Sequence, residues 1–241
     1  MSRKEWLVGS AGFVFTAIFL AMVIASLFSA PSFAADHRTD AVQLVEKSKM
    51  TLESFLSDGN MGAFNDLIRQ AKGVFIAPQV LKGAFIFGAS GGSGVFVTWS
   101  EKTERWGGPA FYTIGGASFG LQIGGQAAEV GILAMTDRGV KALLSSSVKL
   151  GADVGIAAGP IGVGASAATA NLSADILSFS RAKGLYGGIS LDGAVVAVRG
   201  VWNEAYYGKK VDPIDILIVQ DAMSPQAASL IQVIEKASGR K

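Results

Sequence analysis

The stretch GAFIFGASGGSGVFVTW, from Gly83 to Trp99, decides how the chain folds, because glycines and serines separate its two apolar runs. A phosphate-binding loop places its backbone amides at the start of a helix, and the Walker form adds Lys before Ser or Thr. The segment from Gly88 to Gly94 has no Lys, and Val95 to Trp99 after it are β-branched and aromatic strand formers. The glycines therefore predict the corner of a β-hairpin, where positive φ is tolerated.

The chain around this stretch alternates apolar with small or polar residues, which is typical of strands with one buried face. Because helices do not alternate regularly with these strands, the pattern predicts an α+β fold. We expect a single domain of mainly antiparallel strands, forming a sandwich or a barrel-like sheet. The expected strand segments, besides the opening one, are GVFIAP (73–78), SFGLQIGGQ (118–126), VKLGADVGI (148–156) and GLYGGISLDGAVVAV (184–198).

Helices are predicted at both ends and once in the middle. An amphipathic helix over Ala41–Leu56 is expected to start at Thr39 or Asp40 and to stop at Asp58-Gly59-Asn60, with a short helix after it. Its apolar face allows two interpretations, packing on the sheet or contact with a membrane. The remaining expected helices are TDRGVKALLSS (136–146), capped by Thr136 or Asp137, VRGVWNEAYYG (198–208) and one opened by Ser224-Pro225.

Residues 1–34 have the features of an export signal. A basic start is followed by an uncharged stretch from Leu7 to Ala30, and Ser32-Phe33-Ala34 suits cleavage after Ala34. The stretch is also long enough to span a bilayer, so a retained membrane anchor through residues 7–30 is the alternative. Both interpretations place the domain, residues 35–241, outside the cytoplasm, either periplasmic or secreted.

Composition narrows the classes of function. The chain has no Cys and one His, His37, so thiol chemistry, Cys-ligated zinc and a Ser-His pair in the core are not expected. A formal net charge of +2 lacks the basic excess of nucleic-acid binders. We expect no metal and no cofactor. Paired carboxylates for hydrolysis are the remaining enzymatic option, and the available ones are Glu129, Asp137, Asp153, Asp175 and Asp192.

Four cations beside glycine-bearing strand ends are the candidate binding residues. They occur in AKG, LKG and SRAKG, and they can hold an anionic head group. The alternative is simple solvation of strand ends. The four residues are Lys72, Lys82, Arg181 and Lys183.

The motifs GGASFGLQIGGQ (115–126), SRAKGLYGGISL (180–191) and YYGKKVDPIDIL (206–217) occur in this order. With AKGVFIAPQVLKGAFIFGASGGSGVFVTW (71–99), they resemble the SYLF family of lipid-binding domains, whose relatives include Ysc84-type actin-binding proteins. The resemblance covers Lys72 to Leu217 and implies a non-enzymatic domain that binds membrane lipids. The arrangement resembles the bacterial exported form, which does not favour actin as a partner.

We therefore predict a non-enzymatic domain of the bacterial cell envelope that binds anionic or phospholipid head groups. The first alternative is an envelope structural or protein-interaction module without a lipid ligand. A carboxylate-dependent hydrolase is the second.

Overall fold

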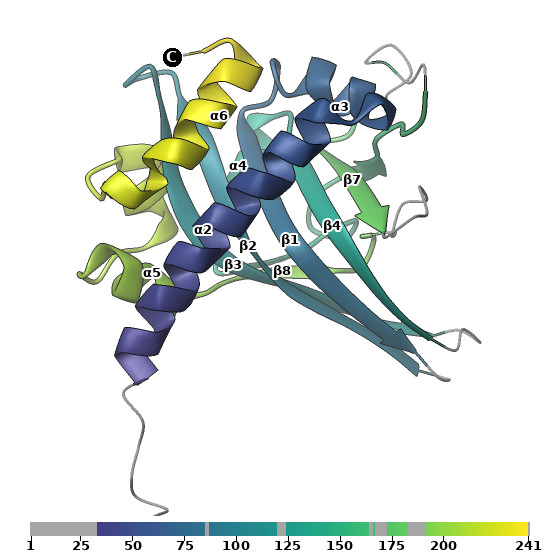
Figure 1. The fold of residues 1–241 in the computed structure, drawn as a ribbon, viewed down its shortest axis with the longest axis horizontal. Coiled ribbons are helices and arrows are strands. Elements are labelled where there is room, and N and C mark those ends of the chain that lie inside the picture. Colours follow the sequence, from purple (N-terminus) through teal and green to yellow (C-terminus); the bar gives the residue numbers. More distant parts are fainter. Residues whose placement is uncertain are drawn as a thin grey trace, which may run out of the picture. The chain divides into compact units, whose positions relative to one another are not determined.

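The computed structural model describes residues 33–84, 87–119, 124–163, 166, 173–182 and 191–240. Among these residues, eight strands form one curled, half-barrel-like sheet in the order β5-β8-β3-β2-β1-β4-β7-β6 (Figure 1). Neighbouring strands are antiparallel except β6 and β7, which confirms the predicted α+β class. The strands are β1 (Gly73–Ala84), β2 (Phe87–Ser100), β3 (Arg105–Phe119), β4 (Gly124–Ala134), β5 (Ser147–Lys149), β6 (Ile156–Ala158), β7 (Ile176–Ala182) and β8 (Val195–Val198).

The glycine-rich run is part of a strand, so the predicted hairpin corner at Gly88–Gly94 is wrong. The whole run lies in β2, paired with β1 on one side and β3 on the other, and the antiparallel β1 ends at Ala84, before β2 begins at Phe87. The physical reason is close packing. A Cβ on Gly92 would lie 2.3 Å from the Gln79 carbonyl oxygen, and one on Gly94 would lie 2.4 Å from a Phe75 ring carbon. The exclusion of a phosphate loop holds, because a strand continues after the glycines.

A bulge near Pro78 bends the sheet. The register of β1 shifts between Ile76 and Gln79 against β2, and between Ala77 and Val80 against β4. Proline has no N–H to give to a ladder, and bulges increase local twist. Beyond the bulge, β1 to β4 extend past the helices (Figure 1).

Three helices cover one face of the sheet and bury most of their apolar side chains, as the packing interpretation predicts. The helix α2 (Phe33–Ser57) buries Ala41, Val45 and Phe55 completely. It begins before Thr39, so the predicted cap at Thr39 or Asp40 is wrong, whereas Asp58 ends it and caps η1 (Gly59–Met61). The other two helices of this face are α3 (Gly62–Leu67) and α6 (Ala228–Ser238).

The remaining helices follow the sequence signals closely. Thr136 caps α4 (Asp137–Leu144) by accepting a hydrogen bond from the Gly139 amide at 3.1 Å. Gly208, in the left-handed conformation, ends α5 (Gly200–Tyr207). Ser224-Pro225 opens the 3₁₀ turn η4 (Pro225–Ala227) that leads into α6, as predicted. A π-helix, η3 (Asp215–Val219), was not predicted.

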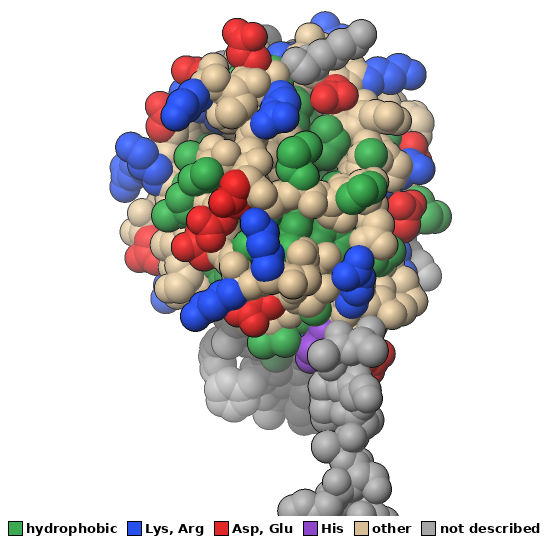
Figure 2. Space-filling view, turned by 90° about the vertical axis from the view of Figure 1, so that its left-hand side faces the viewer, with side chains coloured by type: hydrophobic (Ala, Val, Ile, Leu, Met, Phe, Trp, Pro, Cys, Tyr) green, Lys and Arg blue, Asp and Glu red, His purple; other side chains and the backbone are tan. Residues whose placement is uncertain are grey.

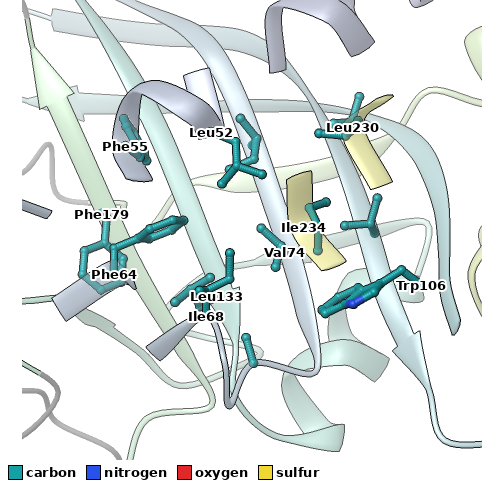
Figure 3. Close-up of a cluster of buried hydrophobic side chains, with 14 of the residues drawn as sticks. Leu52, Phe55, Phe64, Ile68, Val74, Trp106, Leu133, Phe179, Leu230 and Ile234 are labelled. Carbon is teal, nitrogen blue, oxygen red and sulfur yellow. The ribbon is translucent and has the colours of Figure 1, made fainter. Parts of the chain in front are cut away.

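The core lies on both faces of the sheet. Along β1, Val74 and Ile76 join the cluster under α2, α3 and α6, while Phe75 and Ala77 join the cluster on the other face. This is the alternation expected of a strand buried on both sides. Figure 3 shows the first cluster, in which the ring of Phe64 lies edge-on to Phe179 with 5.3 Å between centroids.

Two predicted strands are shorter than expected. Within 148–156, Gly151 adopts φ +85° and the chain turns between β5 and β6, so the continuous strand predicted there is wrong. Within 118–126, β3 ends and β4 begins, and residues 120–123 lie outside the described residues. Residues 184–190 of the segment 184–198 also lie outside, and β8 forms its last part.

No helix in the described part of the chain is long and apolar enough to cross a membrane. The stretch from Leu7 to Ala30 lies outside that part, so the predicted signal or anchor stays a prediction.

Candidate functional site

The structure describes three of the four predicted cations, Lys72, Lys82 and Arg181, and does not bring them together in one site. Lys72 precedes the first residue of β1, and Lys82 lies near the other end of that strand. At 3.3 Å per residue, the two lysines are separated by roughly 30 Å along the strand. Arg181 lies in β7 opposite Glu129 of β4. Lys183 lies outside the described residues. Lys72 and Lys82 are thus too far apart to hold one head group.

Arg181 has a structural set of partners. Its guanidinium donates to Glu129 Oε2, with Nε at 2.8 Å, to Asp58 Oδ2 at 2.9 Å and to Ser54 Oγ at 2.6 Å. The guanidinium carbon also lies 5.2 Å from the ring centroid of Phe55. Hydrogen bonds to these carboxylates raise the pKa of Arg181 against the opposing effect of burial. Arg181 therefore ties the end of α2 to β4 and β7.

Lys72 opens onto a cavity of about 660 Å³ between the start of β1, the end of β2, α4 and η3. Its ammonium lies 2.7 Å from Asp137 Oδ1, and this hydrogen bond lowers the pKa of Asp137. Among the described residues, no carboxylate lies within ion-pair distance of Lys102 or Lys141. We call this cavity the basic pocket, and its charged lining residues are Lys72, Lys102, Lys141, Arg240, Glu101 and Asp137.

Arg240 is fixed in the wall of the basic pocket. Its Nη2 donates to the carbonyl oxygens of Arg69 at 2.5 Å and Ala71 at 2.8 Å. The guanidinium carbon lies 5.4 Å from the ring centroid of Trp99 and 5.5 Å from that of Trp106. Burial lowers the pKa of Arg240, and Glu101 counters that effect. A cation held in this way needs little further ordering when an anion arrives.

An exposed apolar segment adjoins the basic pocket. Four of the nine large apolar side chains that are exposed in the described residues fall between residues 214 and 223. Two of them, Ile214 and Ile218, also line the basic pocket. We call residues 214–223 the apolar segment, and its exposed members are Ile214 (49%), Ile218 (41%), Val219 (55%) and Met223 (72%).

The apolar segment is held rigidly from inside. Ile216 and Leu217 are fully buried, and Asp212 accepts hydrogen bonds from the amides of Ile214 at 2.8 Å and Asp215 at 3.0 Å. Gln220, at φ +59°, ends η3 and receives a hydrogen bond from Thr103 Oγ1 at 2.7 Å. Figure 2 faces the side where α5, α6 and the segment between them lie, and shows apolar side chains among charged ones.

Sequence reasoning missed most of this surface. Lys102, Lys141 and Arg240 come from different elements, and no local pattern connects them with Lys72. The available signal was the run Ile214–Val219, because five apolar residues and one Asp on a short helix cannot all face the core.

The carboxylates considered for hydrolysis do not gather into one site. Glu129 binds Arg181, Asp137 binds Lys72, and Asp175 accepts a hydrogen bond from Thr136 at 2.7 Å. Asp153 accepts one from the Lys149 amide at 2.7 Å. In the part of the chain that the structure describes, no three His, Cys, Asp or Glu side chains are placed to hold a metal ion.

In comparisons with known proteins, the matching family model and the similar proteins indicate the same family. Residues 115–237, just over half of the chain, match the Ysc84 family model, described as "Las17-binding protein actin regulator". The chain is 28% identical to Protein YSC84 of Saccharomyces cerevisiae over 200 residues, which is 79% of this chain and 42% of that protein. It is 29% identical to human SH3 domain-containing YSC84-like protein 1 over 171 residues, which is 70% of this chain and 49% of that protein.

A third relative is LAS seventeen-binding protein 3 of Saccharomyces cerevisiae, 30% identical over 174 residues, covering 70% of this chain and 38% of that protein. The chain thus spans less than half the length of each of these three relatives. The matched region contains β4, β7, α5 and the apolar segment. The family-model match over half of the chain and the 30% identity to a relative that covers 70% of it show that this chain belongs to the Ysc84, or SYLF, domain family.

Proposed function

We propose that this domain binds anionic membrane surfaces through the basic pocket and the apolar segment, and that it catalyses no reaction. The observation that carries the proposal is the contact of Ile214 and Ile218, both exposed, with a cavity lined by four cations. Membrane-binding surfaces combine these features, because cations attract anionic lipids while apolar side chains enter the interface.

The magnitudes are adequate for reversible binding. Each Lys or Arg near an anionic leaflet contributes about 1 kcal/mol, and the contribution falls as salt screens the charge. Burying a fully exposed Ile side chain contributes about 2 kcal/mol, so the half-exposed Ile214 and Ile218 contribute roughly 1 kcal/mol each. Two unpaired lysines and two isoleucines therefore give about 4 kcal/mol before orientation costs, which suits weak and salt-sensitive binding.

Replacing both Lys102 and Lys141 by Ala tests the charge contribution. We expect affinity for phosphatidylglycerol-containing phosphatidylcholine vesicles to fall about thirtyfold, because two charges contribute about 2 kcal/mol. Vesicle flotation over a series of lipid concentrations measures the change.

The matched control is Lys149→Ala with Lys236→Ala, which removes the same charge from residues outside the basic pocket. It should leave affinity nearly unchanged. An equal loss in both double variants would show diffuse charge attraction and contradict the site. If folded wild-type protein bound no vesicles but co-purified with a stoichiometric protein partner, the result would favour the protein-interaction module without a lipid ligand.

We also propose that the domain acts outside the cytoplasm, as a periplasmic or secreted protein of the bacterial envelope. Support comes from residues 1–34 alone, with their basic start, apolar stretch and small residues before Ala35. We do not extend the proposal to actin, because actin is mentioned only in the description of the family model, and this chain spans less than half of each relative compared above.

Export gives a direct prediction about the mature chain. Expression of the full sequence in a bacterial host should give envelope-associated protein whose intact mass is that of a chain starting at Ala35. The reason is that a signal of this kind is removed after Ala34. Intact-mass spectrometry of fractionated cells makes the measurement. A full-length mass in the membrane fraction would show the retained anchor instead, and a full-length mass in the cytoplasm would contradict export.

A further inference from the structure

A cavity of about 420 Å³ lies between α6, the start of β3 and the chain that runs from η3 to η4. Its volume is within the range of small-molecule sites, and it shares no lining residue with the basic pocket. We call it the α6 cavity. Most of the residues that line it are apolar, among them Trp106, Ile216, Met223, Pro225 and Ile231.

One side of α6 packs on the core, and another side forms a wall of the α6 cavity. Leu230 and Ile234 are buried in the core cluster (Figure 3). Because Ala228 begins α6 and Glu235 lies in its last turn, the wall runs from an apolar end to a carboxylate. The wall residues follow helical spacing: Ala228, Ile231, Gln232 and Glu235.

The facing wall is held in place by hydrogen bonds. The Gln220 side chain donates from Nε2 to the Arg105 carbonyl oxygen at 3.2 Å and accepts from Thr103 Oγ1 at 2.7 Å. Trp106 is 5% exposed, and its Nε1 donates to Ser238 Oγ at 3.2 Å. A cavity whose walls are fixed before binding loses little conformational entropy when a ligand arrives.

Two opposite charges lie at the same end of the α6 cavity. The hydrogen bond between Trp106 and Ser238 joins the start of β3 to the last turn of α6. Arg105 directly precedes Trp106, and Glu235 lies about one turn before Ser238. Within the described ranges, neither Arg105 nor Glu235 has an opposite charge at ion-pair distance. Both charges are therefore available to a ligand that carries an anionic and a cationic group.

We propose that the α6 cavity binds a free α-amino acid with a large apolar side chain. The ligand carboxylate accepts hydrogen bonds from the Arg105 guanidinium, whose planar fork matches a carboxylate. The ligand ammonium donates to the Glu235 carboxylate. The apolar side chain of the ligand lies against Trp106, Ile216 and Ile231.

The position of the two charges favours a free amino acid over a peptide. Both charges lie at one end of the cavity, and a free amino acid carries its ammonium and carboxylate on one carbon atom. The two charged ends of a peptide lie further apart. The inference goes beyond the membrane-surface proposal, because a separate cavity carries it.

Isothermal titration calorimetry of the folded full chain with phenylalanine tests the ligand class. N-acetylphenylalanine lacks the ammonium and phenylalaninamide lacks the carboxylate, so each should bind about tenfold more weakly through the loss of a charge-assisted hydrogen bond. The dipeptide phenylalanylphenylalanine should also bind about tenfold more weakly. Affinity should rise from alanine to leucine, by about fourfold for each methylene that is buried. Equal binding of phenylalanine and its two blocked forms, or no binding of leucine, methionine, phenylalanine or tryptophan at millimolar concentrations, would overturn the assignment.

Charge-removing variants test the site. Arg105→Gln and Glu235→Gln should each weaken phenylalanine binding about tenfold. The matched controls are Arg69→Gln and Glu204→Gln, which remove the same charges from exposed positions outside the α6 cavity. They should change binding less than about twofold. Equal affinities in the cavity variants and their controls would contradict the proposed contacts.

A cavity-filling variant tests the site independently of charge. Ala228→Trp, at an exposed position of the wall, should abolish phenylalanine binding, with thermal unfolding as the measure of intact fold. Undiminished binding by this variant would place the ligand elsewhere. Vesicle flotation is a separate readout: Lys102→Ala with Lys141→Ala should lower it and leave phenylalanine binding unchanged. A loss of phenylalanine binding in that double variant would place the ligand in the basic pocket and overturn the assignment.

Discussion

Arg181→Met is expected to destabilise the domain by about 3 kcal/mol, because removing one partner of a largely buried ion pair leaves the other charges uncompensated. Arg181 is 20% exposed and serves two carboxylates, those of Asp58 and Glu129. Met keeps most of the side-chain volume, so the loss reports charge and hydrogen bonding more than a cavity. Urea denaturation at neutral pH measures the free energy of unfolding.

Arg138→Met is the matched control for Arg181. Its side chain is 71% exposed and its guanidinium lies 3.7 Å from Asp175 Oδ2, so we expect a loss below about 0.5 kcal/mol. A similar loss of stability in both variants would contradict the conclusion that Arg181 ties the end of α2 to β4 and β7.

The effect of Arg181 should also depend on pH. The pKa of Asp58 is lower in the folded state, first by the Asn60 amide and then by Arg181. A lowered folded pKa stabilises the protein above the unfolded value, near 3.9, and that contribution is lost as pH falls through the folded value. The difference between wild type and Arg181→Met should therefore be full at neutral pH and shrink below about pH 4.

Gly92→Ala is expected to cost about 3 kcal/mol, at the upper end of the range for overpacking. The added Cβ would lie 2.3 Å from the Gln79 carbonyl oxygen and 3.0 Å from Val80 Cα, and both are backbone atoms of a paired strand. Backbone in a ladder cannot rotate aside as a side chain can, so β1 and β2 must separate. Thermal unfolding followed by circular dichroism measures the loss.

The neighbouring residue gives a sharp control. A Cβ added to Gly91 would meet no atom within 4 Å, and the φ of Gly91 is not in the left-handed region. Gly91→Ala should therefore change stability by less than about 0.5 kcal/mol. Suppose that Gly91→Ala lowered the free energy of unfolding as much as Gly92→Ala. The glycine-rich residues 88–94 would then need positive φ, and the strand assignment of β2 would be wrong.

Local signals in the sequence determined several elements correctly. Thr136 predicted the start of α4, and Ser224-Pro225 predicted the start of the turn that leads into α6, because a cap depends on residues within one turn. The strand formers after Gly94 ruled out a phosphate loop, and strand patterns without a regular alternation of helices predicted a mainly antiparallel sheet. The apolar stripe of α2 was visible at helical spacing, although its burial needed the sheet.

Tertiary structure alone decided what the glycines and the cations do. Gly92 is required by a carbonyl on the neighbouring strand, and Arg181 is occupied by carboxylates from α2 and β4. The basic pocket joins Lys72, Lys102 and Arg240, which lie far apart in the chain. A residue's local sequence fixes its backbone preference, but close approach and charge pairing depend on distances that only the folded sheet establishes.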